Sequence, residues 1–254
     1  MTVRPKKELG QHFLVDENIL GVIGRLAELA AADVVLEIGP GLGVLTGYLA
    51  DRVARVHAVE LDAKLEPHLP HGDRVSLHFG DALALDLAAL DPPPGKLVAN
   101  LPYNVATPIV AESLDSLPGI ELWCVMVQRE VADRFFAVPS TKAYGAVSVL
   151  IQLATARTGF HPVSRSVFRP PPNVDSALVA FRRTTLPPDF AGLRKVVEGA
   201  FAHRRKTLAN SLQLAGVATR EQAVVGLTAL GLEPAVRAEA LAPPVFLDLA
   251  RLLR

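Results

Sequence analysis

Short apolar runs alternate with helix-like segments across the first two thirds of the chain. A brief apolar run between turn-forming residues is typical of a buried strand, and Leu, Val and Ala at spacings of three and four are typical of a helix. The predicted strands are residues 33–39, 55–62, 74–82, 96–100 and 121–128, and the helices between them include 43–52 and 106–117. Strands alternating with helices predict βαβ units, and therefore an α/β fold with a mostly parallel sheet.

The last third of the chain follows a different pattern. Runs at 153–160 and 176–183 are separated only by a Pro-rich loop, so we expect antiparallel neighbours at one sheet edge. Beyond the linker-like stretch "TTLPPDF", apolar residues recur at helical spacing over 190–215, 219–230 and 243–253. We therefore expect two domains. Residues 1–184 form a catalytic sheet domain with a basic N-terminal arm, and residues 185–254 form a small all-helical domain.

Composition excludes several classes of protein. Half of the residues are hydrophobic, yet no apolar run approaches the ~18 residues that a membrane helix needs. The N-terminal stretch is basic but has no apolar core, so it does not look like a secretory signal. The single cysteine, Cys124 in "ELWCVMV", is interpreted as a buried core residue. We expect a cytoplasmic protein without membrane contact.

Charge is unevenly distributed although the formal net charge is zero. Residues 182–254 carry eleven Lys and Arg against six Asp and Glu, a net charge of +5, which leaves −5 for residues 1–181. The most basic stretch of the positive part contains Arg204, Arg205 and Lys206. A basic helix is a usual source of phosphate contacts. This stretch is therefore a candidate RNA site, although such runs also occur on solvated helix faces.

Polar residues stand at four successive strand ends, where ligands bind in open α/β sheets. "EIGPGLG" (37–43) follows the first strand and opens a helix, and its glycines let the backbone approach a ligand closely. Glu60 ends the second strand, where a carboxylate can accept both hydroxyls of a ribose. Asp81 ends the third strand and could accept from an adenine amino group. Asn100 ends the fourth.

The same region lacks the motifs that bind phosphates. No Lys with Ser or Thr stands in a G-x-x-x-x-G-K-[ST] context, and Val44 replaces the third glycine of a dinucleotide fingerprint. A nucleoside cofactor without phosphates fits better, namely S-adenosylmethionine. The pattern resembles that of the class I, Rossmann-like methyltransferases.

The turn "NLPYN" (100–104) follows the fourth strand. Pro102 holds Leu101 extended, so the Leu101 carbonyl and the Asn100 side-chain oxygen can converge on one point. Two such acceptors could hold both N–H bonds of an exocyclic amino group, and Tyr103 offers a flat face for a base. This combination suits adenine N6 as the methyl acceptor. An ordinary turn with a capping Asn is the structural alternative.

The chain is similar to the KsgA-type 16S rRNA adenine dimethyltransferases. The segments that carry the resemblance are "KKELGQHFLVDENIL", "EIGPGLGVLT", "VELD", "GDAL", "NLPYN", "QREVADR", "YGAVSVLIQ", "FRPPPNVDSA" and "AFAHRRKTLANSL", in this order. The resemblance implies dimethylation of N6 on two adjacent adenosines in a hairpin loop near the 3′ end of small-subunit rRNA.

The resemblance also implies roles for individual residues. By their motif positions, the cofactor contacts are His12, Leu14, Gly39, Gly41, Glu60, Asp81 and Asn100, and the catalytic turn is Asn100, Leu101, Pro102 and Tyr103. The family more often has Asn at position 12. Phe168 matches an aromatic residue that closes over the target base, and a core position anchoring the Pro-rich loop is its alternative. Lys6 and Lys7 join the basic stretch as candidate RNA contacts.

Three other functions remain open. An Erm-like methyltransferase of large-subunit rRNA shares the fold but usually has "NIPY", and the "FRPPPNVDS" segment favours the KsgA type. A non-catalytic RNA-binding assembly factor could keep the same fold. A small-molecule methyltransferase is disfavoured by the basic C-terminal part. The expected partner is 16S rRNA in a small-subunit precursor, acted on by a monomer that uses no metal.

Overall fold

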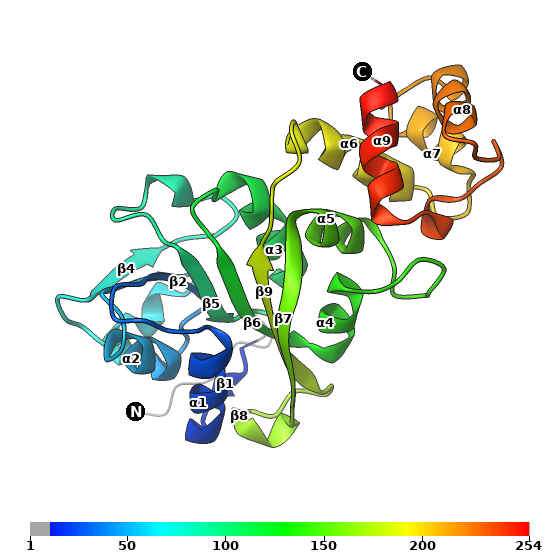
Figure 1. The fold of residues 1–254 in the computed structure, drawn as a ribbon. Helices are drawn as coiled ribbons and strands as arrows, with labels where there is room; N and C mark the ends of the chain where they lie inside the picture. The colour runs from blue at the N-terminus through cyan, green and yellow to red at the C-terminus, as the bar shows by residue number, and fades with distance from the viewer. Residues whose placement is uncertain (1–10, 254) are drawn as a thin grey trace. The chain divides into compact units, whose positions relative to one another are not determined.

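A computed structural model describes residues 11–253 of the chain (Figure 1). The chain divides into two compact units. The first comprises the residues up to Ala132 together with Arg157–Arg183, and the second comprises Asp133–Ala156 and Thr184–Arg254. The second unit thus includes residues 133–156, which the boundary expected near residue 184 placed with the sheet.

Within the described residues, the first unit is built on a seven-stranded sheet with the order β4-β3-β2-β5-β6-β9-β7. The strands are β2 (Val34–Ile38), β3 (Arg55–Glu60), β4 (Val75–Phe79), β5 (Lys96–Asn100), β6 (Leu122–Gln128), β7 (Thr155–Val163) and β9 (Ser176–Arg183). Neighbours from β4 to β6 are parallel, and β9 is antiparallel to β6. In Figure 1, β7 and β9 run in opposite directions. The prediction of a mostly parallel sheet with an antiparallel edge is confirmed.

Helices cover both faces of this sheet. They are α1 (Glu17–Leu26), α2 (Val44–Ala50) and α3 (Ala106–Ser116). Because side chains alternate along a strand, Cys124 and Met126 of β6 pack in the core cluster shared with α1 and α2. Trp123 points to the other face, where its Nε1–H donates to Ser113 Oγ of α3 at 2.8 Å. Cys124 is fully buried, so its interpretation as a core residue is confirmed.

A small antiparallel sheet joins the start of the described chain to the Pro-rich loop. Its strands are β1 (Phe13–Leu14) and β8 (Phe168–Arg169), paired as Phe13 with Arg169 and Leu14 with Phe168. The Val15 N–H extends the pairing by donating to Val167 O at 2.9 Å. Residues 11–14 are thereby held beside the first residues of the "RPPP" segment.

The second unit is helical. Its helices are α5 (Ala146–Ala154), α6 (Phe190–Phe201), α7 (Leu208–Leu214), α8 (Arg220–Ala229) and α9 (Pro243–Leu252), and α4 (Arg129–Phe135) spans the boundary with the first unit. Buried Tyr144 donates its hydroxyl to Leu241 O at 2.7 Å and packs edge-on against Phe201, which stacks on Phe246. In the described part of the chain, no helix is long and apolar enough to cross a bilayer.

The structure corrects the helical pattern expected over 190–215. Helix α6 ends at Phe201 and α7 starts at Leu208, with Thr207 accepting from the Asn210 N–H as its N-cap. Ser211 Oγ donates to Gly199 O at 2.7 Å and accepts from the His203 N–H, which ties the two helices together. The basic stretch 204–206 is therefore an exposed turn, and the prediction that it forms a basic helix was wrong.

Candidate active site

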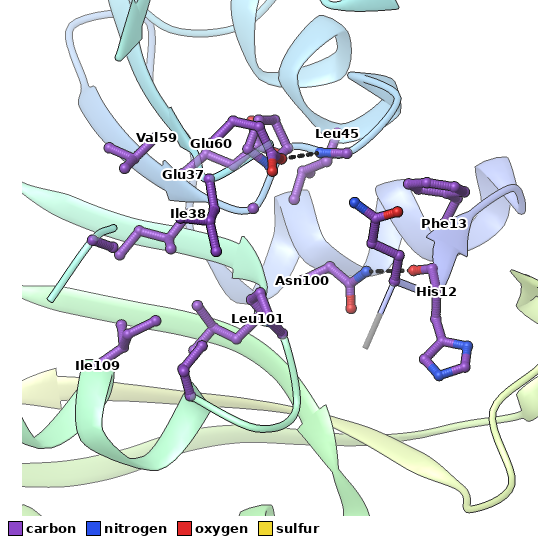
Figure 2. Close-up of a pocket in the computed structure, with 18 of the residues that line it drawn as sticks. His12, Phe13, Glu37, Ile38, Leu45, Val59, Glu60, Asn100, Leu101 and Ile109 are labelled. Carbon is purple, nitrogen blue, oxygen red and sulfur yellow. Dashed lines mark hydrogen bonds between the residues drawn. The ribbon is translucent and has the colours of Figure 1, made fainter. Parts of the chain in front are cut away.

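A pocket lies at the carboxyl ends of the parallel strands of the first unit. Its lining combines the loop after β2, the ends of β3 and β5, and the residues before and within β1. The lining residues include His12, Leu14, Glu37, Gly39, Gly41, Glu60, Asp81, Asn100, Leu101, Pro102 and Tyr103. The fold thus brings together every predicted cofactor-binding residue and the whole turn at 100–103. Figure 2 shows Glu37 and Glu60 on one side of Asn100, with His12 and Phe13 on the other.

The glycines of the loop after β2 are required by the backbone. Gly39 and Gly41 have φ values of +75° and +61°, a region that residues with a Cβ seldom adopt. A Cβ on Gly39 would lie 3.1 Å from Pro102 Cδ, and one on Gly41 would lie 2.9 Å from Phe13 Cδ1. The loop therefore packs closely against both the "NLPY" turn and the chain entering β1.

Glu60 closes this loop onto the end of β3. One carboxylate oxygen accepts from the Gly41 N–H at 3.2 Å and the other from the Asp62 N–H at 2.9 Å. Burial raises the pKa of Glu60, and these two backbone hydrogen bonds oppose the shift. Since each oxygen of a carboxylate can accept more than one hydrogen bond, both oxygens retain capacity for hydroxyl groups in the pocket.

A second carboxyl group, that of Glu37, lies deeper in the same pocket. It is 1% exposed. The Thr46 hydroxyl is close to it, yet neither Glu37 Oε2 nor Thr46 Oγ1 completes a hydrogen bond with any described residue. Burial raises the pKa of Glu37 to about 8, and the neighbouring Glu60 carboxylate adds to the shift. The sequence placed Glu37 among the strand-end residues but gave no sign of this buried, unsatisfied state.

Asp81 lies at the rim of the pocket. Its carboxylate accepts from the Leu83 N–H at 2.9 Å, and its side chain is exposed. Among the residues of 11–253 that line the pocket, three carry carboxyl groups and none is Lys or Arg. This charge balance disfavours phosphate and fits a ligand that carries hydroxyl, amino and cationic groups.

The "NLPYN" turn is fixed by hydrogen bonds to three separate segments. The Leu101 N–H donates to Met126 O of β6 at 3.0 Å. Asn100 Nδ2 donates to His12 O at 3.2 Å, as the dashed line in Figure 2 marks, so its Oδ1 is the atom left to accept from a ligand. The Tyr103 hydroxyl bonds Ser176 Oγ at 2.5 Å, and burial raises the pKa of Tyr103.

His12 contacts the turn through its ring as well as its main chain. The imidazole stacks on Tyr103 with a centroid distance of 5.6 Å and an interplanar angle of 28°. Its Nδ1 lies 2.8 Å from Pro170 O. In Figure 2 the ring points away from Glu60 and Glu37. The contacts of His12 therefore reach toward the "NLPYN" turn and the Pro-rich loop.

Phe168 does not join the pocket. It is 1% exposed and packs in the core cluster with Leu14 and Met126. In this arrangement its ring has no free face for a base, so the expectation that it closes over the target adenine is corrected. Its position matches the alternative of a core residue that anchors the Pro-rich loop.

Of the predicted RNA contacts, the structure describes those in the second unit. Lys6 and Lys7 fall outside the described residues. Arg204, Arg205 and Lys206 belong to the second unit and are exposed. Arg204 is partly engaged, because its guanidinium lies 3.9 Å from the Glu239 carboxylate. Over residues 11–253, no group of three or more His, Cys, Asp or Glu side chains is arranged to hold a metal ion.

Comparisons with known proteins agree with this geometry. A family model described as ribosomal RNA adenine dimethylase matches residues 3–253. "Ribosomal RNA small subunit methyltransferase A" of Rubrobacter xylanophilus is 48% identical over 98% of this chain and 95% of its own length. The protein of that name from Thermobifida fusca is 43% identical over 94% of this chain and 87% of its own.

Solved structures show the same fold. A dimethyladenosine transferase from Plasmodium falciparum superposes with a TM-score of 0.77 at 23% identity, covering 94% of this chain and 96% of that one. The 23S rRNA methyltransferase ErmE superposes with a TM-score of 0.63 at 28% identity, covering 95% of this chain and 99% of its own. On the family model and its near full-length relatives, this chain belongs to the ribosomal RNA adenine dimethylase family.

Proposed function

We propose that this protein uses S-adenosylmethionine to dimethylate N6 of two adjacent adenosines, in a hairpin loop near the 3′ end of 16S rRNA. Membership of the ribosomal RNA adenine dimethylase family supports the reaction type. One observation carries the assignment of the reacting site. Asn100 Nδ2 donates to His12 O, which leaves Oδ1 to accept from a ligand in the pocket that Tyr103 also lines.

The residues of the pocket fit the cofactor. When bound, S-adenosylmethionine supplies an electrophilic methyl group on a sulfonium. We expect Glu60 to accept from ribose hydroxyls and Asp81 to accept from an adenine amino group, since both line the pocket. Gly39 and Gly41 let the backbone approach the methionine part. The excess of carboxyl groups suits a ligand that carries two positive charges and one negative charge.

The target adenine would be held by the turn at 100–103. Its amino group is a weak nucleophile, so alignment supplies much of the catalysis. Asn100 Oδ1 and the Leu101 carbonyl accept the two N–H bonds, and Tyr103 stacks on the base after the base leaves its RNA stack. No covalent enzyme nucleophile is needed.

The RNA is expected to contact the exposed cations of the second unit, namely Arg204, Arg205 and Lys206. Phosphate contacts of this kind provide affinity without sequence information. We propose a small-subunit precursor as the substrate and a monomer as the active form.

Two alternative functions are compatible with the same fold. Methylation of large-subunit rRNA is disfavoured by the higher identity to small-subunit methyltransferases than to ErmE. A non-catalytic assembly factor is disfavoured by the intact set Glu60, Asp81 and Asn100 around one pocket.

A transfer assay separates these functions. The protein is incubated with S-adenosylmethionine labelled in its methyl group and with undermethylated small subunits, large subunits or naked rRNA. The RNA is then digested to nucleosides. We expect labelled dimethyladenosine from small subunits. Label only in large subunits would favour the Erm-like alternative, and no label in any RNA would favour the assembly factor.

A further inference from the structure

The two-stranded sheet of β1 and β8 places an arginine beside the pocket. Arg169 of β8 is paired with Phe13 of β1. Residues directly opposite each other in an antiparallel pair carry their side chains on the same face of the sheet. Phe13 lines the pocket and its ring lies against Gly41. The Arg169 side chain therefore leaves the sheet on the face that is turned toward the pocket.

The opposite face of the same two strands is buried. Leu14 and Phe168, which form the other pair, belong to the core cluster of the first unit. Phe168 is 1% exposed, whereas Arg169 beside it is exposed. Because side chains alternate along a strand, Arg169 points away from this core and extends into solvent at the edge of the pocket.

Arg169 differs from the other arginine of the Pro-rich loop. Arg165 is engaged within the loop, because its Nε lies 3.3 Å from the Asp175 carboxylate and its Nη1 donates to Asn173 O at 3.2 Å. Within residues 11–253, the Arg169 side chain has no ion-pair or hydrogen-bond partner. Its charge is thus available to a ligand, on a strand that β1 holds in place.

We propose that Arg169 binds a backbone phosphate of the RNA next to the target adenosine. This inference rests on the proposed function. A base that leaves its stack to enter the pocket brings its flanking phosphates to the pocket edge. The described residues that line the pocket carry three carboxyl groups, so the approaching polyanion meets negative charge there. A guanidinium at the edge offsets this repulsion and can donate two N–H groups to one phosphate.

The carboxylate of the cofactor is the other anion that could reach this edge. Over residues 11–253, the pocket lining includes Phe13 but not its partner Arg169. The arginine is also exposed, as a contact with a large external polyanion requires. These two features favour the RNA phosphate, and the affinity for the cofactor tests the alternative.

Three variants separate the charge from the shape of the loop. Arg169→Gln removes the charge, and Arg169→Lys keeps it. Arg165→Gln is the matched control, because it changes an exposed arginine of the same loop that already has a partner. Filter binding to undermethylated small subunits is measured at several salt concentrations, and the Kd for S-adenosylmethionine is measured by calorimetry. Fluorescence of Trp123, the only tryptophan in the sequence, reports whether the first unit is folded.

We expect Arg169→Gln to bind small subunits about three- to tenfold more weakly at about 0.1 M salt, and to reduce the slope of log K against log salt by about 0.7–0.9. Its Kd for the cofactor should stay within about twofold of the wild-type value, because the contact is with RNA. Arg169→Lys should retain the wild-type slope, and Arg165→Gln should change neither the affinity for small subunits nor the slope.

A wild-type slope in Arg169→Gln would overturn the proposal. Cofactor binding weakened about tenfold would also overturn it and would assign Arg169 to the cofactor carboxylate. Equal losses in Arg169→Gln and Arg165→Gln would trace the effect to the shape of the loop, with the same consequence for the proposal. Failure of the proposed function itself would appear differently, as a wild type that forms no dimethyladenosine, because the slope is measured without methyl transfer.

Discussion

Glu37 has almost no contact with water, yet it stands in the pocket next to another carboxylate. Its pKa is raised to about 8 from an ordinary value of 4.5. Between these two values the unfolded chain has lost the proton and the folded chain still holds it. The free energy of unfolding therefore falls as the pH rises from about 4.5 to about 8, and the contribution is constant outside that window.

The variant Glu37→Gln tests this carboxyl group. Without the buried carboxyl, the pH dependence that Glu37 adds should disappear. In the wild type, Glu37 should lower the free energy of unfolding by about 3 kcal/mol between pH 5 and pH 8. Urea unfolding of the ligand-free protein, followed by Trp123 fluorescence at several pH values, measures the difference. If the free energy of unfolding changed with pH equally in the wild type and the variant, Glu37 would be ionised in the folded protein throughout this pH range.

Tyr103 makes a second prediction at this scale. The ring face is expected to matter more for the target base than the hydroxyl, which is used in a hydrogen bond to Ser176. Tyr103→Phe should keep most of the activity, and Tyr103→Ala should weaken capture of the base by one to two orders of magnitude with the cofactor Kd unchanged. Ser176→Ala is the matched control, because it removes the same hydrogen bond from the other side. Equal inactivity of Tyr103→Phe and Tyr103→Ala would assign chemistry to the hydroxyl.

The residues of the pocket could be predicted from sequence, but their orientations could not. Strand ends identify Glu60, Asp81 and Asn100, because parallel strands deliver their carboxyl ends to one edge. The hydrogen bond that orients Asn100 joins it to His12, 88 positions away, and no local pattern reports such a contact. For Phe168 the sequence allowed two roles, and only its burial separates them.

At the scale of secondary structure, the strands were predictable because each is apolar and bounded by turn residues. Strand β5 coincides with the predicted range 96–100. The pattern over 190–215 misled because α6 and α7 bury apolar faces at compatible spacings. The break between them depends on Thr207 as an N-cap and on Ser211 contacting Gly199, and apolar periodicity alone does not distinguish these two from ordinary helical residues.

The turn between α6 and α7 carries a prediction for RNA binding. Replacing Arg204, Arg205 and Lys206 by Ala should weaken binding to small-subunit RNA. It should also reduce the slope of log K against log salt by about 0.7–0.9 for each phosphate that is no longer neutralised. Filter binding at several salt concentrations measures the slope. Exposed Arg220 on α8 provides a control in the same unit. A triple variant that retains the wild-type slope would show that this turn does not contact RNA phosphates.

Strands β3 and β4 are joined by a pair of histidines. His57 Nε2 donates to Pro92 O at 2.9 Å, which leaves its Nδ1 to accept from His78 Nε2 at 3.1 Å. Burial lowers the pKa of both rings. For His57, the hydrogen bond to Pro92 and the charge of Asp91 oppose this lowering of the pKa, whereas the charge of Arg55 adds to it. For His78, the neighbouring His57 lowers the pKa further.

Because these pKa values are lower in the folded state, the pair stabilises the first unit above about pH 6.5 and less as the pH falls below it. Replacing His57 and His78 together by Gln should therefore flatten the loss of stability between pH 6.5 and pH 5. Urea midpoints from Trp123 fluorescence measure this, with exposed His71→Gln as the control. A double variant as acid-sensitive as the wild type would contradict the assignment.

For the whole molecule, the proposed cofactor contacts and the RNA contacts proposed at 204–206 belong to different units. The first unit contains all the described residues that line the pocket, with their excess of carboxyl groups, whereas the second unit contains the exposed basic turn. The net charge of zero concealed this division until the two parts of the sequence were counted separately. Fold class, reaction type and substrate class were therefore predictable from motif order, but the second unit also draws residues 133–156 from the middle of the chain.

The central claim is that the turn at 100–103 aligns the amino group of an adenine through Asn100. A single-turnover assay of the first methyl transfer to small subunits tests it directly, comparing Asn100→Ala with the wild type at saturating cofactor. Calorimetry first establishes that the variant binds S-adenosylmethionine. Losing one positioned acceptor should slow the transfer by about 10²–10³-fold. A folded, cofactor-bound Asn100→Ala variant that transfers methyl within about threefold of the wild-type rate would contradict the account.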